Sequence, residues 1–203
     1  MPGMLLSSRD SLPLYKTTLD PNSLPVDYSY REFVSSVKDQ GNSSYCVPYS
    51  ISQIIEWYWR GMSGKKVSFD VKRLYNLRSN KGQDGMTFRD AFNILKSYGY
   101  TLDGRPGQKI LGYVSLSSEI QMKDHLVSYS PFLLGLPVYE TSGNSFWIAS
   151  GKLLGYHAVV ATGYDKSGLQ ILNSWGSAYG SGGYSKLLWR DFSSIQEAWG
   201  IVF

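Results

Sequence analysis

The stretch VKDQGNSSYCVPYS, residues 37–50, contains Cys46, which is the only cysteine in the chain. A helical spacing of apolar residues begins at this cysteine and places it at the start of a helix. There the positive end of the helix dipole and the free N–H groups stabilise a thiolate, and can lower the thiol pKa from ~8.5 into the range ~3.5–7.5. The position therefore favours Cys46 as a nucleophile.

A thiolate nucleophile needs an imidazole as acid and base, and the chain has two histidines. His125 lies among charged residues on an expected helix, and we interpret it as a surface residue. His157 begins the apolar run HAVVATGY, so its ring is expected at the edge of a sheet. If this run pairs as an antiparallel hairpin with LQILN, Asn173 returns beside His157 and its amide can accept the imidazole N–H. Taken singly, each of these residues also has a structural explanation, in the core or in a turn.

Two kinds of element must hold these residues. Helices are expected from Cys46, with Ser43 or Ser44 as cap, over residues 69–77, after Thr87 and after Ser118. Strands are expected in the later runs FLLGLPVYE, YHAVVATGYD, LQILNSW, GYSKLLW and AWGIVF. The prediction is an α+β chain, with an N-terminal extension over 1–23, a helical half over about 24–110, and an antiparallel, barrel-like half over about 111–203.

Charge and hydropathy exclude several classes of protein. The net charge is +4 with a pI near 9.0, but the lysines and arginines are scattered, so neither a nucleic-acid nor a membrane partner is expected. No window approaches the ~20 apolar residues of a membrane span, and the apolar start at 4–6 is too short for a signal peptide. A single cysteine forms no internal disulfide, so we expect a cytoplasmic or other reducing compartment, possibly in a particle. The sequence does not indicate the oligomeric state.

Four segments resemble the papain-like cysteine peptidases. They are LPVDYSYREFVSSVKDQG at 24–41, KGQDGMTFRDAFNILKSYG at 81–99, GYHAVVATGYD at 155–165 and ILNSWGSAYGSGGYSKL at 171–187. The resemblance covers about residues 24–203 in the order of that family, and the Asn-Ser-Trp-Gly block is its most specific part. It implies a papain-like fold, with the active site in the cleft between a helical half and an antiparallel half.

The resemblance also implies a role for each matching residue. Cys46 would attack the peptide carbonyl, His157 would shuttle the proton, and Asn173 would hold the imidazole tautomer. The side-chain amide of Gln40 and the backbone N–H of Cys46 would stabilise the oxyanion, where one such donor is worth ~10²–10³ in rate.

The same resemblance implies a substrate-binding surface. Trp175 would shield the contact between Asn173 and His157 from water. Gly85, Met86, Thr87 and Ala158 would form an apolar pocket for the substrate side chain two positions before the cut. The chemistry requires no cofactor and no metal, and the expected partner is a peptide or protein substrate.

The chain departs from that family around the thiol. Ser43 stands where a disulfide-forming cysteine is usual, and Tyr45 and Val47 flank the thiol with unusual bulk. His157 follows Cys46 by 111 residues and Asn173 by 127, below the ~130–150 expected, so loops have been trimmed. Residues 1–23 are shorter than a large inhibitory pro-segment, and we hypothesise that they pack on the body or along the cleft, because SLPLY at 11–15 is apolar.

These patterns favour a cysteine endopeptidase with a Cys46 acyl-enzyme. One alternative is a catalytically silent papain-like module that binds or supports a larger assembly. Another is related thiol chemistry on a different acyl group, because an oxyanion hole serves transpeptidation and amide hydrolysis equally well.

Overall fold

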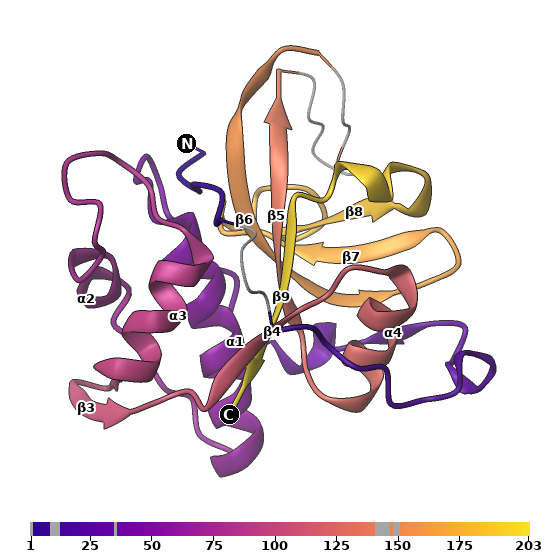
Figure 1. Cartoon of the computed structure of the whole chain (residues 1–203), viewed down its shortest axis with the longest axis horizontal. Helices are drawn as coiled ribbons and strands as arrows, with labels where there is room; N and C mark the ends of the chain where they lie inside the picture. Colours follow the sequence, from indigo (N-terminus) through magenta and orange to yellow (C-terminus); the bar gives the residue numbers. More distant parts are fainter. Residues whose placement is uncertain (1, 9–12, 35, 141–146, 148–150) are drawn as a thin grey trace.

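Helices α1–α3 lie on one side of the molecule and the main sheet on the other, as Figure 1 shows. This arrangement is seen in a computed structural model that describes residues 2–8, 13–34, 36–140, 147 and 151–203. The predicted α+β fold class is confirmed. The α-helices are α1 (Cys46–Ser63), α2 (Val71–Asn76), α3 (Phe88–Ser97) and α4 (Glu119–Ser128), with short 3-10 turns at Pro21–Ser23, Arg31–Phe33 and Trp189–Ser194.

The described residues form one seven-stranded sheet and a separate two-stranded hairpin. The large sheet has the order β4-β9-β5-β6-β7-β8, with β1 also paired to β6, and its strand pairs are antiparallel. The strands are β1 (Tyr28–Ser29), β2 (Tyr100–Leu102), β3 (Arg105–Gln108), β4 (Gly112–Ser115), β5 (Phe132–Tyr139), β6 (Leu153–Tyr164), β7 (Gly168–Leu172), β8 (Tyr184–Leu188) and β9 (Glu197–Val202).

The four predicted helices and five predicted strands are present, and local signals fix several of their ends. The Thr87 hydroxyl accepts from the Asp90 N–H at 3.0 Å and begins α3. Ser118 does the same for the Gln121 N–H at 3.2 Å and begins α4. Helix α1 ends at Gly64, whose φ of 68° is the left-handed conformation that glycine adopts without strain.

The predicted cap of α1 is wrong. Tyr45 occupies the N-cap position without a side-chain hydrogen bond, so neither Ser43 nor Ser44 caps the helix. The Ser43 hydroxyl instead donates to the Gln40 carbonyl at 2.7 Å. The Ser43 hydroxyl, which was predicted to cap the helix, therefore forms a hydrogen bond within the preceding loop.

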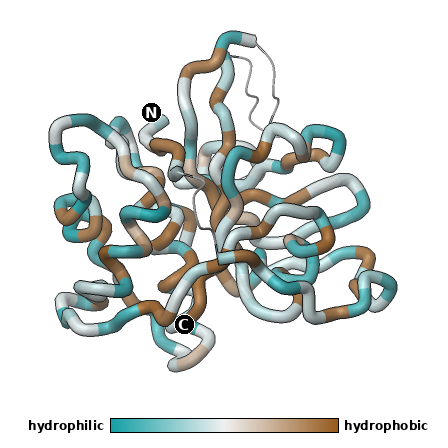
Figure 2. The backbone as a smooth tube through the Cα atoms, viewed as in Figure 1, coloured by the Kyte–Doolittle hydropathy of each residue, from teal (hydrophilic) through white to brown (hydrophobic). Residues whose placement is uncertain are grey.

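Two hydrophobic clusters lie on opposite faces of the sheet, and β6 contributes to both. Ala158 and Val160 belong to the cluster with α1 and α3, whereas Val159 and Ala161 belong to the cluster with α4. Alternate side chains of a strand point to opposite faces, which explains why this run is apolar throughout. Figure 2 shows the hydrophobic segments concentrated where the helices meet the sheet.

His125 lies on α4 as predicted, but its interpretation as a surface residue is wrong. The side chain is only 2% exposed, and the rings of Tyr15, Tyr129 and Phe132 surround it. The charged neighbours in the sequence gave the wrong indication, because Tyr15 comes from a segment more than one hundred positions earlier.

Of the helices that the structure describes, none combines the length and apolarity that crossing a membrane demands.

Candidate active site

Cys46 is the first residue of α1 and is fully buried. Burial raises the pKa of its thiol, and this effect outweighs hydrogen bonds from the backbone of Ala158, Gly3 and Val47, which favour the thiolate. The lowered pKa expected from the start of a helix is therefore not observed. In this arrangement the sulfur is covered and protonated.

His157 lies within β6, opposite Leu136, and is fully buried. It is not at the beginning of the strand, because β6 extends four residues further toward the N-terminus. Its Nε2 lies 2.8 Å from Asn173 Oδ1, and because an amide oxygen only accepts, Nε2 carries the proton. Nδ1 is buried and has no hydrogen-bond partner among the described residues. A lone pair is thus held on Nδ1, which is the form that a general base needs.

The β6–β7 hairpin brings His157 and Asn173 together, as predicted. Val160 pairs with Leu172 at the end of β7, and Asn173 follows directly. Burial lowers the pKa of His157 to about 4, although the hydrogen bond to Asn173 opposes this shift. The imidazole is therefore neutral in the covered site.

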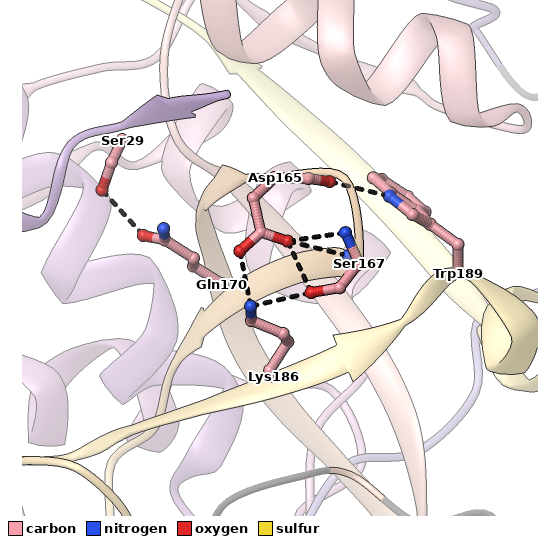
Figure 3. A network of polar contacts seen from close by, with 7 residues as sticks. Ser29, Asp165, Ser167, Gln170, Lys186 and Trp189 are labelled. Atoms are coloured by element: carbon pink, nitrogen blue, oxygen red, sulfur yellow. Dashed lines mark hydrogen bonds and ion pairs between the residues drawn. The ribbon is translucent and has the colours of Figure 1, made fainter. Parts of the chain in front are cut away.

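Asp165 closes the turn of this hairpin (Figure 3). Its carboxylate accepts from the backbone N–H groups of Ser167 at 2.8 Å and Gly168 at 3.1 Å, and from Lys186 on β8. Burial raises the pKa of Asp165, but these hydrogen bonds, led by Lys186, hold it well below its usual range. The network connects the turn to β8 and supports the two strands that carry His157 and Asn173.

Two tryptophan rings stack on the imidazole. The Trp175 ring lies 4.5 Å from the His157 ring at 25°. Trp147 lies 6.2 Å away and parallel within 2°, fixed by hydrogen bonds from its ring Nε1 to the Pro137 carbonyl and from its backbone N–H to the Lys186 carbonyl, both 2.7 Å. Trp147 was not predicted from the sequence. Its signal was a lone tryptophan in the polar stretch between two predicted strands.

Gln40 connects the loop before α1 to the segment after Asn173. Its backbone N–H donates to the Ser174 carbonyl at 2.8 Å, and its Oε1 accepts from the Ser174 hydroxyl at 2.7 Å. Since Oε1 accepts, the amide Nε2 points the other way and donates to the Ser43 carbonyl at 2.7 Å. The amide predicted to stabilise an oxyanion is therefore held in the loop that leads to Cys46.

The predicted pocket residues occupy three different situations. Met86 and Ala158 are fully buried in the same hydrophobic cluster as Cys46. Gly85 has a φ of 95° and donates its N–H to the Tyr75 hydroxyl at 2.9 Å. The Thr87 hydroxyl caps α3 by accepting a hydrogen bond from the Asp90 N–H.

The bulky residues on either side of the thiol pack into the body of the protein. The Tyr45 ring packs on the Tyr75 ring at 4.0 Å, and Val47 is fully buried in the hydrophobic cluster. Tyr75 therefore supports both Tyr45 and the loop with Gly85, a role that was not predicted from the sequence.

Residues 2–8, which we call the cleft segment, lie between the two walls of the site. The Met86 N–H donates to the Gly3 carbonyl, and the Leu5 N–H donates to the Met86 carbonyl, both at 3.0 Å. On the opposite wall, the Met4 N–H donates to the Tyr156 carbonyl at 3.2 Å. These contacts fit the hypothesis that the first residues pack along the cleft. Residues 11 and 12 of the SLPLY run lie outside the described residues.

A metal centre has no support in the described part of the chain, where no group of three His, Cys, Asp or Glu residues could hold a metal ion.

Comparison with known proteins gives distant sequence relatives and a strong structural match. No family model matches the chain. It is 26% identical over 192 residues to the cathepsin L-like proteinase of Fasciola hepatica, covering 80% of this chain and 59% of that protein. It is 26% identical over 222 aligned positions to digestive cysteine proteinase 1 of Homarus americanus, covering 92% and 68%.

Among solved structures, xylellain, a cysteine protease from Xylella fastidiosa, superposes with a TM-score of 0.86 at 22% sequence identity. The superposition covers 99% of this chain and 95% of xylellain. This likeness confirms the predicted papain-like α+β fold.

Proposed function

We propose that this chain, which belongs to the papain-like cysteine peptidase family by distant sequence similarity and by fold, is a cysteine endopeptidase that forms an acyl-enzyme on Cys46. The observation that carries the proposal is the contact between the two walls of the site. Cys46 and Ala158, the residue directly after His157, are both fully buried in one hydrophobic cluster, and hydrogen bonding to the Ala158 backbone favours the Cys46 thiolate by lowering its pKa. The same His157 is held by Asn173 at 2.8 Å.

The chemistry follows from the proton positions. With Nε2–H donated to Asn173, the Nδ1 lone pair takes the thiol proton, and the thiolate attacks the substrate carbonyl carbon. The imidazolium then gives that proton to the leaving amine as the C–N bond breaks and a thioester remains. Water, deprotonated by the same nitrogen, attacks the thioester and releases the acid product, which restores the thiol.

The oxyanion of each tetrahedral intermediate needs donors that are already in place. We assign these donors to the backbone N–H of Cys46 and to the Gln40 amide. Gln40 is 5% exposed and hydrogen-bonded through Oε1, so its amide plane is fixed before substrate binds. We propose extended peptide or protein as substrate, because the relatives at this level of similarity are proteinases.

The test is covalent labelling by a peptidyl epoxysuccinyl inhibitor, read by intact mass. We expect one adduct on the unmodified protein, none on Cys46→Ala, and labelling slowed by at least ~10² in His157→Ala, as expected for loss of a positioned base. A folded protein that forms no adduct, even when residues 2–8 are displaced, would contradict the proposal and favour a silent binding module.

A further inference from the structure

We propose that Gln53 is a positioning residue of the candidate active site, which ties Asn173, and through it the His157 ring, to the helix that carries Cys46. The contact that does this is the hydrogen bond from the Gln53 Nε2 to the Asn173 carbonyl, at 3.2 Å. The inference rests on the proposed function and names a further residue of the same site.

Gln53 and Cys46 lie on the same face of α1. They are seven residues apart, which is close to two turns of an α-helix and about 10 Å along its axis. Cys46 packs in the same hydrophobic cluster as Ala158 on β6, and Gln53 reaches the Asn173 carbonyl at the end of β7. One face of the helix therefore contacts both strands of the β6–β7 hairpin.

The main chain of Asn173 is held on both sides. Its N–H donates to the Gly183 carbonyl at 3.0 Å, directly before β8, and its carbonyl accepts from Gln53. Its side-chain Oδ1 accepts the Nε2–H of His157 at 2.8 Å. The position of Oδ1 depends on the position of this main chain, because the side chain has few torsions of its own. The contact from Gln53 connects the whole unit to α1.

The Gln53 amide is only partly satisfied by its surroundings. The side chain is 6% exposed, on a helix where Ile51, Ile54 and Ile55 are fully buried. Its Nε2 is paired, but its Oε1 has no hydrogen-bond partner among the described residues. A buried acceptor without a partner costs free energy that an apolar side chain in this place would not. The amide therefore fits a positional role better than a stabilising one.

The proposed chemistry depends on the position of two groups from different elements. Cys46 belongs to α1 and His157 to β6, and the imidazole Nδ1 must face the thiol when the proton moves. The Gln53 contact fixes α1 against the residue that orients the ring. Without this contact, α1 can shift relative to Asn173, and the distance between base and nucleophile changes.

The test is Gln53→Met, with Ser52→Ala as its matched control. Methionine has the length of glutamine and lacks both amide groups, so the variant exchanges one unpaired acceptor, Oε1, for another, the Asn173 carbonyl. The midpoint of urea unfolding should therefore shift by about 0.5 M or less. Ser52 is the neighbouring residue on α1, is fully buried, and donates its hydroxyl to the Tyr49 carbonyl at 2.7 Å within the helix.

Steady-state kinetics with a peptide substrate give the first readout. The kcat of Gln53→Met should fall about tenfold while KM stays within about twofold, as expected when only the position of the reacting groups changes. Ser52→Ala should keep both constants within about twofold of the unmodified chain. An unchanged kcat in Gln53→Met would overturn the inference and leave the proposed function intact.

The two histidine rings give a second readout that does not depend on turnover. The Nε2–H of His157 is held by Asn173. The Nδ1–H of His125 is held by the Ser130 carbonyl, which can only accept. In NMR spectra of isotope-labelled histidine, Gln53→Met should speed the exchange of the His157 ring N–H with water severalfold and leave that of His125 unchanged. The chain has two histidines, so His125→Asn assigns both signals.

The spectra separate a positional role from a general one. Equal acceleration of exchange at both rings, together with a large fall in the urea midpoint, would indicate that Gln53 stabilises the whole fold, and would overturn the inference. Absence of turnover in the unmodified chain would contradict the proposed function, and the spectra would then decide by themselves whether Gln53 holds the His157 ring.

A second variant tests whether reach or polarity matters. Gln53→Asn keeps the amide and shortens the side chain by one methylene, so the amide no longer reaches the Asn173 carbonyl, which is already 3.2 Å away. Its kcat should fall like that of Gln53→Met. A Gln53→Asn protein as active as the unmodified chain would show that the contact with Asn173 is not required, and would overturn the inference.

Discussion

The two histidines lie in regions that look alike by burial and differ in their partners. Both side chains are at most 2% exposed, and burial lowers the pKa of each to about 4. His125 Nδ1 forms a hydrogen bond with the Ser130 carbonyl at 3.0 Å. A Cβ added to Gly200 would lie 2.2 Å from the His125 Nε2, so Gly200 packs closely against this ring. His157 instead bonds Asn173 and keeps a buried Nδ1 without a partner in the described part of the chain.

The difference shows that a shifted pKa does not by itself identify a catalytic histidine. Aromatic rings and backbone enclose His125, which gives it a packing role. His157 shares the same desolvation but is oriented by a neutral amide, with its neighbour Ala158 at the thiol. The side-chain amide that orients the His157 ring, more than the burial, points to chemistry.

The largest effect is expected from paired substitutions of the two histidines. His157→Asn should slow turnover of a peptide substrate by ~10²–10⁴, because it removes the acid and base. His125→Asn should leave turnover per folded molecule within about threefold and lower the free energy of unfolding by about 1–3 kcal/mol, as for a disturbed buried hydrogen bond. Steady-state kinetics measure the turnover of both variants, and urea denaturation measures their free energy of unfolding. Equal losses of turnover in the two variants would contradict a catalytic role for His157 and a packing role for His125.

The pH dependence of stability tests what the two regions share. The pKa of each histidine is about 4 when folded and 6.5 ordinarily, so the unfolded chain binds more protons between these values. The contribution of the two neutral histidines to the free energy of unfolding should therefore be complete above pH 6.5. It should fall as the pH drops toward 4, by at most about 1.4 kcal/mol per histidine and pH unit. Urea denaturation across this window should give a smaller slope in His125→Asn. An unchanged slope would contradict the buried neutral state of His125.

Asn173→Ala tests whether the side-chain amide of Asn173 orients the His157 ring. The variant removes the acceptor of Nε2–H and of the Ser174 N–H, which lies 2.7 Å from the same oxygen. The imidazole can then rotate or change tautomer, and we expect kcat to fall by about 10², at the lower end for acid–base groups. The ratio of kcat to KM effects is the informative measurement, because a structural role alone would not concentrate the loss in kcat.

Gly200→Ala changes the surroundings of His125 without touching the cleft. The added Cβ would meet the His125 ring, and overpacking of this kind costs about 1–3 kcal/mol. Gly112→Ala on β4 is the matched control, because the nearest atom to its added Cβ is 4.0 Å away. Thermal unfolding should separate the two variants. A Gly200→Ala protein as stable as Gly112→Ala would indicate that the His125 ring can move aside.

The smallest effect is expected in the hairpin that carries His157 and Asn173. Asp165→Asn removes the charge that Lys186 pairs with, and since the side chain is 34% exposed, we expect a loss of about 1 kcal/mol or less at neutral pH. The folded pKa of Asp165 lies below its ordinary value, so this stability is present above the unfolded pKa and is lost as the pH falls through the folded one. Comparing the two proteins by urea denaturation at neutral and strongly acidic pH should show the difference shrinking with acid.

Much of the fold could be predicted because its signals are local. Thr87 and Ser118 cap helices with backbone N–H groups three residues away, and the turn at Asp165 closes a hairpin within four residues. The pairing of β6 with β7 then follows from chain geometry, and it brings Asn173 to His157.

The missed features depend on side-chain partners that the pattern of residue types does not specify, whether three residues away or distant in sequence. The wrong cap of α1 arose because Gln40 takes the Ser43 hydroxyl, and Trp147 required the Pro137 and Lys186 carbonyls to fix its ring. The short strands β2, β3 and β4 were not predicted. The sequence of β3, RPGQ, contains a proline and a glycine and lacks an apolar pattern.

Residue types and the spacing of the β6–β7 hairpin were enough to predict the candidate nucleophile, base and orienting amide and the strands next to them, because these signals are local. Only the tertiary structure decided the state of the thiol. Position at a helix start predicted a lowered pKa for Cys46, but Gly3 covers the sulfur, and burial raises that pKa instead. Desolvation depends on every atom that excludes water, and the residues clustered with Cys46 include Met4 and Ala158, both distant from it in the chain.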